Sequence, residues 1–309
     1  MRTLATFLLF SLTLMGGALG ASAQAQSNAG MRFLPGDIDV VGSVDLAGLR
    51  GTDTWRVLRP ALESFASQQA GMPRTGAASF QSLTDDAARF SFGLYANAAR
   101  SSARGVFVAE GNFNVEGLTA ALVATPTMTR ADLGTTISFR GPEGMRVALY
   151  DASTLVMGSD AEVAAAVDRV QKNEPARLNA DLQRQMHRAS QSRQVWIAAR
   201  VTPAMRALAS DLNDVRGVVM TLDLSQGLRA SISLQATEAV VGQMATEFAA
   251  NQERLGSTPE LAMLGLTSVV RGLSMRAEGD VGTVDLQLAA TEWNRLVVTL
   301  GALLESELR

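Results

Sequence analysis

The sequence predicts an α+β fold in which antiparallel sheets are backed by helices. The clearest sign is a hairpin at 215–236, where apolar and polar residues alternate along both arms and the loop Ser225-Gln226-Gly227 places Gly where a positive φ is needed. Alternating strands also occur at 38–46, 89–95, 104–111, 137–149, 154–158, 194–199 and 273–288. Between them, apolar residues recur at helical spacing, as in 163–170 and 293–304. Clean alternation leaves one strand face in water, which is typical of antiparallel sheets.

The hairpin predicts both a core and an exposed surface. Its apolar face carries Leu222, Leu224, Ile232 and Leu234, which we expect to be core. Its polar face is the best candidate for a binding surface, and its residues are Thr221, Asp223, Arg229, Ser231, Ser233 and Gln235. The closing strands would extend it with Ser274, Arg276, Thr283, Asp285 and Gln287. The simpler alternative is that this is the solvated side of a sheet.

Helix starts are marked by capping residues. One of Thr52, Asp53 and Thr54 is expected to cap a helix that carries Trp55, and Asn114 to cap a short one. The residues Ser159-Asp-Ala-Glu162 predict a capping box. Thr202-Pro203 predicts a helix with Pro at its first position.

The two halves of the chain share the order strand, helix, hairpin, helix, meander, helix. We therefore predict two similar modules, 31–172 and 193–309, joined by a polar segment at 173–192. The alternative is chance, because an α+β chain of this length can produce such an order without duplication. Whether the modules share one sheet or form two is left open.

The first 23 residues predict a secretory signal peptide, with a basic start, a short apolar run and Ala21-Ser22-Ala23 before a cleavage site. A membrane anchor is the alternative, but the run is shorter than the ~20 residues that span a bilayer. We expect cleavage after Ala23, a disordered leader at 24–30, no transmembrane segment in the mature chain, and a periplasmic or secreted location. The chain has no Cys, so no disulfide stabilises it.

Composition excludes several functions. A net charge of −3 gives no overall attraction to nucleic acid, and the arginines are scattered singly, so we assign them no recognition chemistry. The only His is His187, in a polar helical segment, which we expect to be a surface residue. Without a second His or any Cys, zinc, copper and haem sites cannot be built, and no Gly-x-Ser-x-Gly motif is present. We expect no cofactor and no enzymatic activity.

Carboxylates remain as possible ligands or catalysts. Asp37, Asp39 and Asp45 are close in sequence, as are Asp85-Asp86, but none lies in a calcium-loop pattern. We expect them to lie on a solvated strand edge or to cap helices. Distant carboxylates such as Asp39 and Asp223 could in principle cleave a glycosidic bond. The three tryptophans Trp55, Trp196 and Trp293 lie on apolar faces and are expected to be core.

Two stretches resemble uncharacterised exported proteins of Gram-negative bacteria. These are the opening Leu34-Pro-Gly-Asp-Ile-Asp-Val-Val-Gly-Ser-Val-Asp-Leu46 and Leu155-Val-Met-Gly-Ser159 before a helix. The resemblance, together with the signal peptide, implies an exported α+β protein and carries no activity with it.

The leading hypothesis is therefore an exported, non-enzymatic protein that binds or assembles with a protein or other partner in the cell envelope. A second hypothesis is a carrier of a small apolar ligand or lipid. In a carrier, methionines would form an adaptable pocket; the candidates are Met145, Met157, Met220, Met244 and Met275. A third is a carboxylate-dependent hydrolase using Asp39 or Asp223.

Overall fold

The computed structural model describes residues 29–56, 59, 85–96, 104–189, 193–209, 212–257 and 267–307. The predicted signal peptide and most of the helix expected after Thr54 lie outside the described residues. The predicted leader, 24–30, overlaps the first described helix at its last two residues, where Gly30 is buried.

The elements follow the predicted order. The first half contains η1 (Ala29–Phe33), β1 (Val40–Asp45), α2 (Leu46–Leu49), β2 (Ala87–Tyr95), β3 (Arg104–Gly111), α5 (Val115–Val123), β4 (Thr129–Arg130), β5 (Ile137–Arg140), η2 (Pro142–Gly144), β6 (Met145–Asp151), β7 (Thr154–Ser159) and α6 (Asp160–Gln171). The second half contains α7 (Ala180–Arg188), β8 (Val195–Arg200), α8 (Pro203–Leu208), β9 (Gly217–Asp223), β10 (Gly227–Gln235), α9 (Glu238–Gly256), α11 (Thr267–Gly272), β11 (Leu273–Glu278), β12 (Val281–Ala289) and α12 (Ala290–Glu307). The α+β prediction is confirmed.

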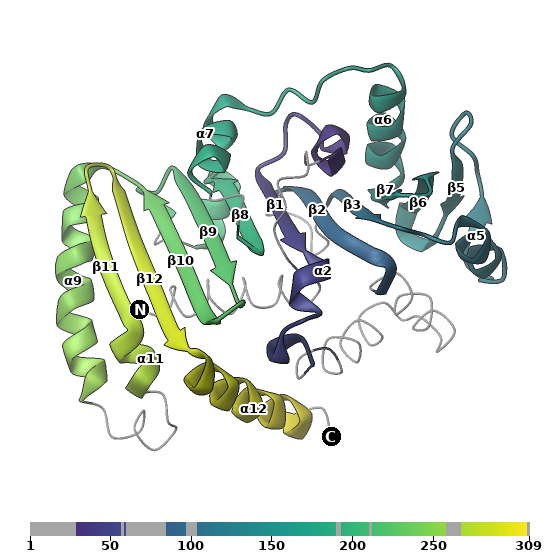
Figure 1. Cartoon of the computed structure of the whole chain (residues 1–309). Coiled ribbons are helices and arrows are strands. Elements are labelled where there is room, and N and C mark those ends of the chain that lie inside the picture. Colours follow the sequence, from purple (N-terminus) through teal and green to yellow (C-terminus); the bar gives the residue numbers. More distant parts are fainter. Residues whose placement is uncertain are drawn as a thin grey trace.

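All twelve described strands form one antiparallel sheet, in the order β11-β12-β10-β9-β8-β1-β2-β3-β7-β6-β5-β4 (Figure 1). The halves meet where β1 pairs with β8, with Val40 opposite Ala199 and Val44 opposite Val195. Outward from this pair, the first half runs β1, the hairpin β2–β3, its last strand β7 and then β6. The second half runs β8, the hairpin β9–β10, its last strand β12 and then β11. This matching order is what a repeated module would give, and duplication itself stays a prediction.

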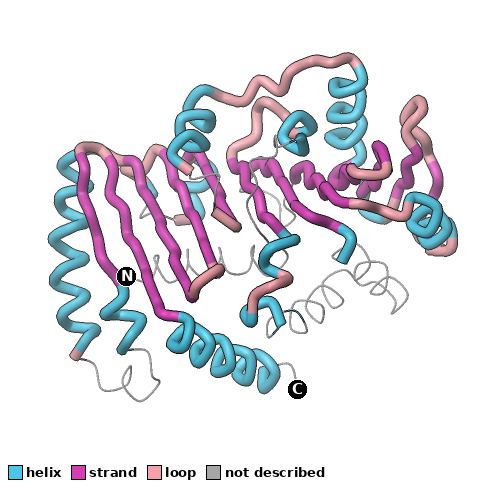
Figure 2. The backbone as a smooth tube through the Cα atoms, viewed as in Figure 1, coloured by secondary structure: helices cyan, strands magenta, loops and turns pink. Residues whose placement is uncertain are grey.

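Helices cover both faces of this sheet (Figure 2). On one side, which we call the α7 face, Val41, Val108 and Trp196 are buried together with apolar residues of η1, α6 and α7. On the other, the α12 face, Val44, Val195 and Leu288 are buried, with side chains of α5 and α12 packed against them. In Figure 1, α6 and α7 lie above the strands and α12 lies below them. Within the described residues, no helix has the length and apolar character needed to cross a membrane.

The hairpin that anchored the sequence prediction is β9–β10. Gly227 in its loop has φ +113°, a conformation that favours glycine, as predicted. Leu224 is fully buried on the α12 face, where Leu222, Ile232 and Leu234 are partly buried. The predicted core of the hairpin is confirmed.

Three of the predicted caps are confirmed and one is wrong. Asn114 accepts a hydrogen bond from Gly117 N at 2.9 Å. The hydroxyls of Thr52 and Thr202 accept from Trp55 N and Met205 N. The capping box at 159–162 does not form, because the Ser159 side chain makes no cap bond. Instead Glu162 accepts a hydrogen bond from Tyr95 Oη at 3.0 Å and forms an ion pair with Arg104, so long-range partners displace the local one.

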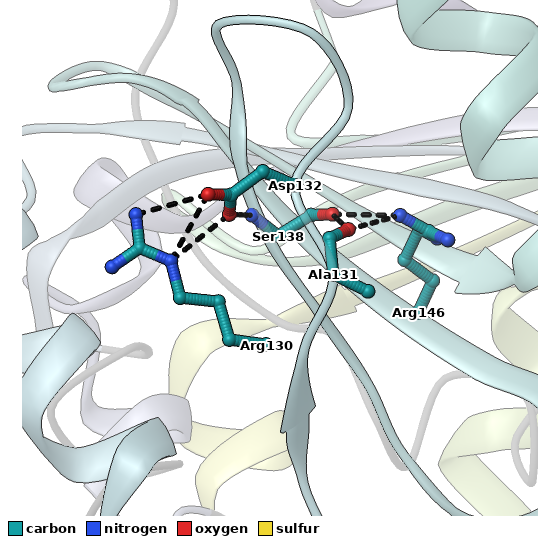
Figure 3. Close-up of polar contacts among 5 residues, drawn as sticks. All are labelled: Arg130, Ala131, Asp132, Ser138 and Arg146. Atoms are coloured by element: carbon teal, nitrogen blue, oxygen red, sulfur yellow. Dashed lines mark hydrogen bonds and ion pairs between the residues drawn. The ribbon is translucent and has the colours of Figure 1, made fainter.

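A buried arginine ties the end of the sheet to α6. Arg146 on β6 is only 2% exposed, and its Nη1 donates to Ala131 O and to Ser138 Oγ, both at 2.7 Å (Figure 3). Its Nε forms an ion pair with Asp160, the first residue of α6. Burial opposes ionisation of Asp160, but hydrogen bonds from Arg146 and Arg140 outweigh it and lower the pKa of the carboxyl.

We predict that Arg146→Met lowers the free energy of unfolding by roughly 3 kcal/mol, because the methionine fills the space but leaves Ala131 O and Ser138 Oγ without their donor and Asp160 without its buried partner. Urea unfolding at pH 7 measures this. Arg140→Met is the matched control: Arg140 pairs with the same Asp160 at 3.1 Å but is 58% exposed, so its loss should cost less than about 1 kcal/mol. Equal losses in the two variants would contradict the role assigned to the buried network.

Candidate functional site

The six predicted surface residues all lie on the α7 face, and one of them, Gln235, is hydrogen-bonded to Gln185 of α7. The strand register places Thr221, Ser231, Asp285 and Ser274 in one row across β9, β10, β12 and β11. The opposite side of these strands carries the apolar residues packed by α9, α11 and α12. We call the exposed side the polar face; it consists of Thr221, Asp223, Arg229, Ser231, Ser233, Gln235, Ser274, Arg276, Thr283, Asp285 and Gln287.

Most charges on the polar face are paired. Arg276 Nη2 lies 2.8 Å from Asp285 Oδ2, and Arg193 Nη1 lies 2.7 Å from Asp223 Oδ2. Burial opposes ionisation of Asp223, but hydrogen bonds from Ser225 and Arg193 outweigh it and lower the pKa of the carboxyl. Arg229 is exposed and has no ionic partner in the described part of the chain. By itself the polar face is a nearly neutral surface.

At one end the polar face runs into a pocket. Gln235 ends β10 and lines both; its Nε2 donates to Asp280 Oδ2 at 2.7 Å, and its Oε1 accepts from Gln185 Nε2 at 2.6 Å. The pocket has a volume of about 310 Å³ and lies where β8 ends, α8 begins and α7 passes over the sheet. Its lining residues are Asp181, Arg184, Gln185, Arg200, Val201, Thr202, Pro203, Arg206, Arg216 and Gln235.

The pocket is cationic. Four arginines line it, and two of them have a carboxylate partner in the described part of the chain: Arg184 pairs with Asp181, and Arg200 Nη2 lies 2.6 Å from Asp39 Oδ1. Arg206 donates to a backbone carbonyl, that of Val215, at 3.3 Å. Among the described residues, Arg206 and Arg216 have no acidic partner. A pocket with two uncompensated guanidinium groups is a favourable place for an anion.

Two buried donors in this pocket also lack acceptors. The Nε atoms of Arg200 and Arg206 are inaccessible to solvent and have no hydrogen-bond partner among the described residues. A buried donor without an acceptor costs roughly 1–3 kcal/mol. Because solvent does not reach them, these two atoms do not themselves face a ligand in the pocket.

The pocket could not be recognised from the sequence. Its arginines come from α7, the end of β8, α8 and the residue before β9, and in the sequence they stand singly among unrelated neighbours. Antiparallel pairing brings them together, since Arg200 is opposite Gly217 and Arg216 N donates to Gln235 O at 2.7 Å. Our assignment of no recognition chemistry to the arginines overlooked this convergence.

The aspartates at 37–45 were expected on a solvated strand edge or as helix caps, and this expectation is wrong for Asp39 and Asp45; Asp45 precedes α2 but its side chain makes no cap hydrogen bond. Asp39 and Asp45 are 7% and 8% exposed, because β1 lies at the centre of the sheet and both of its faces are covered. Asp39 accepts from Ala96 N at 2.8 Å as well as pairing with Arg200. Asp37 accepts a hydrogen bond from Tyr95 Oη at 2.8 Å. These partners are protein groups, and the described residues contain no cluster of three His, Cys, Asp or Glu that could hold a metal ion.

The carboxylates considered for hydrolysis lie far apart. Asp39 pairs with Arg200 at one end of β8, and Asp223 pairs with Arg193 just before the other end. Seven residues of extended chain separate these partners, a distance of about 20 Å. Paired catalytic carboxylates in glycosidases are roughly 5–9.5 Å apart, so these two do not form such a pair.

The remaining candidates lie outside the pocket. His187 is exposed on α7 and Asp85 pairs with Arg59 at 3.0 Å. Trp55 and Trp196 are buried, and Trp293 packs against the same core as Trp55, as predicted. The methionines of the carrier hypothesis do not gather round one cavity. They lie on β6, β7, β9, α9 and β11, strands and helices at opposite ends of the sheet.

No protein-family model matches the chain, and no curated protein matches it. Solved structures do resemble it: crystal forms III, I and IV of TP0453 give TM-scores of 0.55, 0.53 and 0.54. The alignments cover 88–90% of this chain and 96–98% of those chains, at 10–11% sequence identity. At this identity the likeness shows the α+β fold alone.

Asp45 offers a pH-dependent test of the buried centre. Burial raises the pKa of its carboxyl to about 6, although Arg89 acts in the opposite direction. The folded state therefore favours the protonated acid, and wild-type stability should fall as the pH rises from 4 through 6. We predict that Asp45→Asn is more stable than wild type by about 2 kcal/mol at pH 7.5 and equal to it at pH 4.

Urea unfolding at both pH values measures this difference. Asp53→Asn, at an exposed aspartate paired with Arg56, serves as the control and should change stability little at either pH. A pH-independent effect of Asp45→Asn would contradict the assignment.

Proposed function

We propose that this chain is a non-enzymatic binding protein of the cell envelope and that it holds a small anion in the arginine-lined pocket. The observation that carries the proposal is that two guanidinium groups of one pocket, Arg206 and Arg216, have no acidic partner among the described residues, in a chain whose net charge is −3. A cationic pocket in an acidic protein does not follow from overall composition and is specific to this place in the fold.

The chemistry of the lining supports binding over catalysis. Arginine stays protonated at physiological pH and cannot act as a general base, and the one carboxylate in the lining, Asp181, is paired with Arg184. Hydrogen bonds between guanidinium and an anion are charge-assisted and stronger than neutral ones. The pocket can therefore hold and orient an anion.

The polar face extends the proposed site. It begins at Gln235, which lines the pocket, and continues over β10, β12 and β11 with hydroxyl and amide groups. These groups can hydrogen-bond to polar parts of a larger ligand or of a protein partner whose anionic group lies in the pocket. The polar side of the hairpin at 215–236, which we predicted to be a binding surface, would then lie at the entrance to the site.

We predict that sulfate and succinate stabilise the protein beyond an equal ionic strength of sodium chloride. An anion at ten times its Kd contributes about 1.4 kcal/mol. That corresponds to a rise in Tm of roughly 3–6 °C for a protein of this size. Thermal unfolding with and without each anion measures it, and isothermal titration calorimetry gives the Kd.

Arg216→Gln should weaken binding by at least about tenfold, since a charge-assisted hydrogen bond contributes roughly 1.5–3 kcal/mol. Arg216 is exposed, so the variant should fold normally. Arg271→Gln removes an exposed arginine on α11, outside both the pocket and the polar face, and should bind like wild type. The proposal fails if neither anion binds, or if the two variants lose affinity equally.

The envelope location rests on the predicted leader. We predict that the protein isolated from a Gram-negative host has Gln24 at its N-terminus, because the Ala-x-Ala site directs cleavage after Ala23. Intact mass spectrometry of periplasmic and cytoplasmic fractions measures this. A full-length chain confined to the cytoplasm would contradict the location and leave the anion site standing.

A further inference from the structure

We propose that the anion held in the pocket is the phosphate of a phosphomonoester. This inference rests on the proposed function and adds the class of ligand. It draws on three features of the pocket: its uncompensated charge, the number of segments that supply its donors, and its size.

Charge favours a group with two negative charges. Arg184 and Arg200 are each neutralised by an aspartate, whereas Arg206 and Arg216 have no acidic partner in the described segments. A phosphomonoester carries roughly −1.5 to −2 at pH 7 and would balance both guanidinium groups. A single carboxylate would leave one of them uncompensated.

The donors come from four separate segments. Arg184 is on α7, Arg200 ends β8, Arg206 is on α8 and Arg216 precedes β9. A phosphate monoester has three terminal oxygens that accept hydrogen bonds in different directions. A carboxylate has two coplanar oxygens, which suit one bidentate guanidinium. Guanidinium groups on four different segments match the tetrahedral group better.

The volume leaves room for a small organic part. About 310 Å³ is at the lower limit of ligand pockets, which are roughly 300–1,000 Å³. Val201 and Pro203 supply apolar surface beside the arginines, and the chain of hydrogen bonds from Gln185 through Gln235 to Asp280 fixes the orientation of the Gln235 amide. A phosphate on a body of a few carbon atoms fits this lining.

The experiment compares glycerol 3-phosphate with succinate and sulfate by calorimetry on the full mature chain. At pH 7.5 we expect glycerol 3-phosphate to bind at least about tenfold more tightly than succinate. Because the second pKa of a phosphomonoester is near 6, its dianion is about fourfold more abundant at pH 7.5 than at pH 5.5. Its affinity should fall by about that factor at pH 5.5.

Sulfate is the control for the protein's own titration. The charged groups around the pocket are Asp181 and Arg184 on α7, Arg200 with its partner Asp39, Arg206 on α8, Arg216, and Asp280 beside Gln235. Sulfate keeps its charge over this pH range, so a change in any of these carboxylates would alter sulfate and phosphomonoester binding alike. We expect the affinity for sulfate to change less than about twofold.

Variants and a second probe complete the test. Arg206→Gln and Arg216→Gln should each weaken glycerol 3-phosphate binding by at least about tenfold, and Arg271→Gln, on α11 outside the site, should not. If soluble phosphomonoester does not bind, vesicles containing phosphatidic acid, compared with phosphatidylcholine alone, test a lipid-borne phosphate through the same variants.

This inference would be overturned if succinate bound more tightly than glycerol 3-phosphate and phosphatidic acid, or if the affinity for glycerol 3-phosphate did not change with pH. The proposed function, an anion-binding protein, would then still stand. Absence of binding by every anion would overturn the proposed function as well.

Discussion

The pairing of β1 with β8 is the interaction on which the rest of the structure depends. Five residue pairs, from Val40–Ala199 to Val44–Val195, join the two halves into one sheet. Both strands carry small or β-branched residues and are covered on both sides, so Val41, Val44, Val195 and Ala198 are buried. A strand in this position cannot keep its polar residues in water. Ser43, Asp39 and Asp45 are therefore buried too, and each must find a partner or bear the cost of desolvation.

Asp39 shows how that constraint reaches the pocket. Its carboxylate accepts the backbone N–H of Ala96 and pairs with Arg200, the last residue of β8. The ion pair holds Arg200 at the rim of the sheet, where the polypeptide turns into α8. The same antiparallel pairing brings Arg216 and Gln235 alongside. The cationic pocket is thus a consequence of how three strand ends meet beneath α7, and its charge comes from positioning side chains that are far apart in sequence.

The sheet uses its two sides differently. The α12 side carries apolar residues along its whole length, whereas on the α7 side the buried apolar cluster extends only as far as β9 and polar residues lie beyond it. The pocket lies near this boundary, with covered core on one side and hydroxyl and amide groups on the other. A ligand bound there would have a partly dry environment for its charge and a polar surface for the rest of its structure, which suits binding without chemistry.

The sequence by itself determined the elements and which face of most strands is apolar. The alternation in 215–236 predicted β9 and β10, the polar set from Thr221 to Gln235 shares one face, and local caps such as Asn114 form as expected. Only the tertiary structure decided which side chains from distant parts of the chain lie next to each other. Glu162 contacts Tyr95 and Arg104 instead of capping its own helix, and four arginines that are far apart in the sequence line one pocket. The reason is physical: periodicity and capping act over a few residues, whereas burial and charge pairing depend on strands brought together from distant parts of the chain.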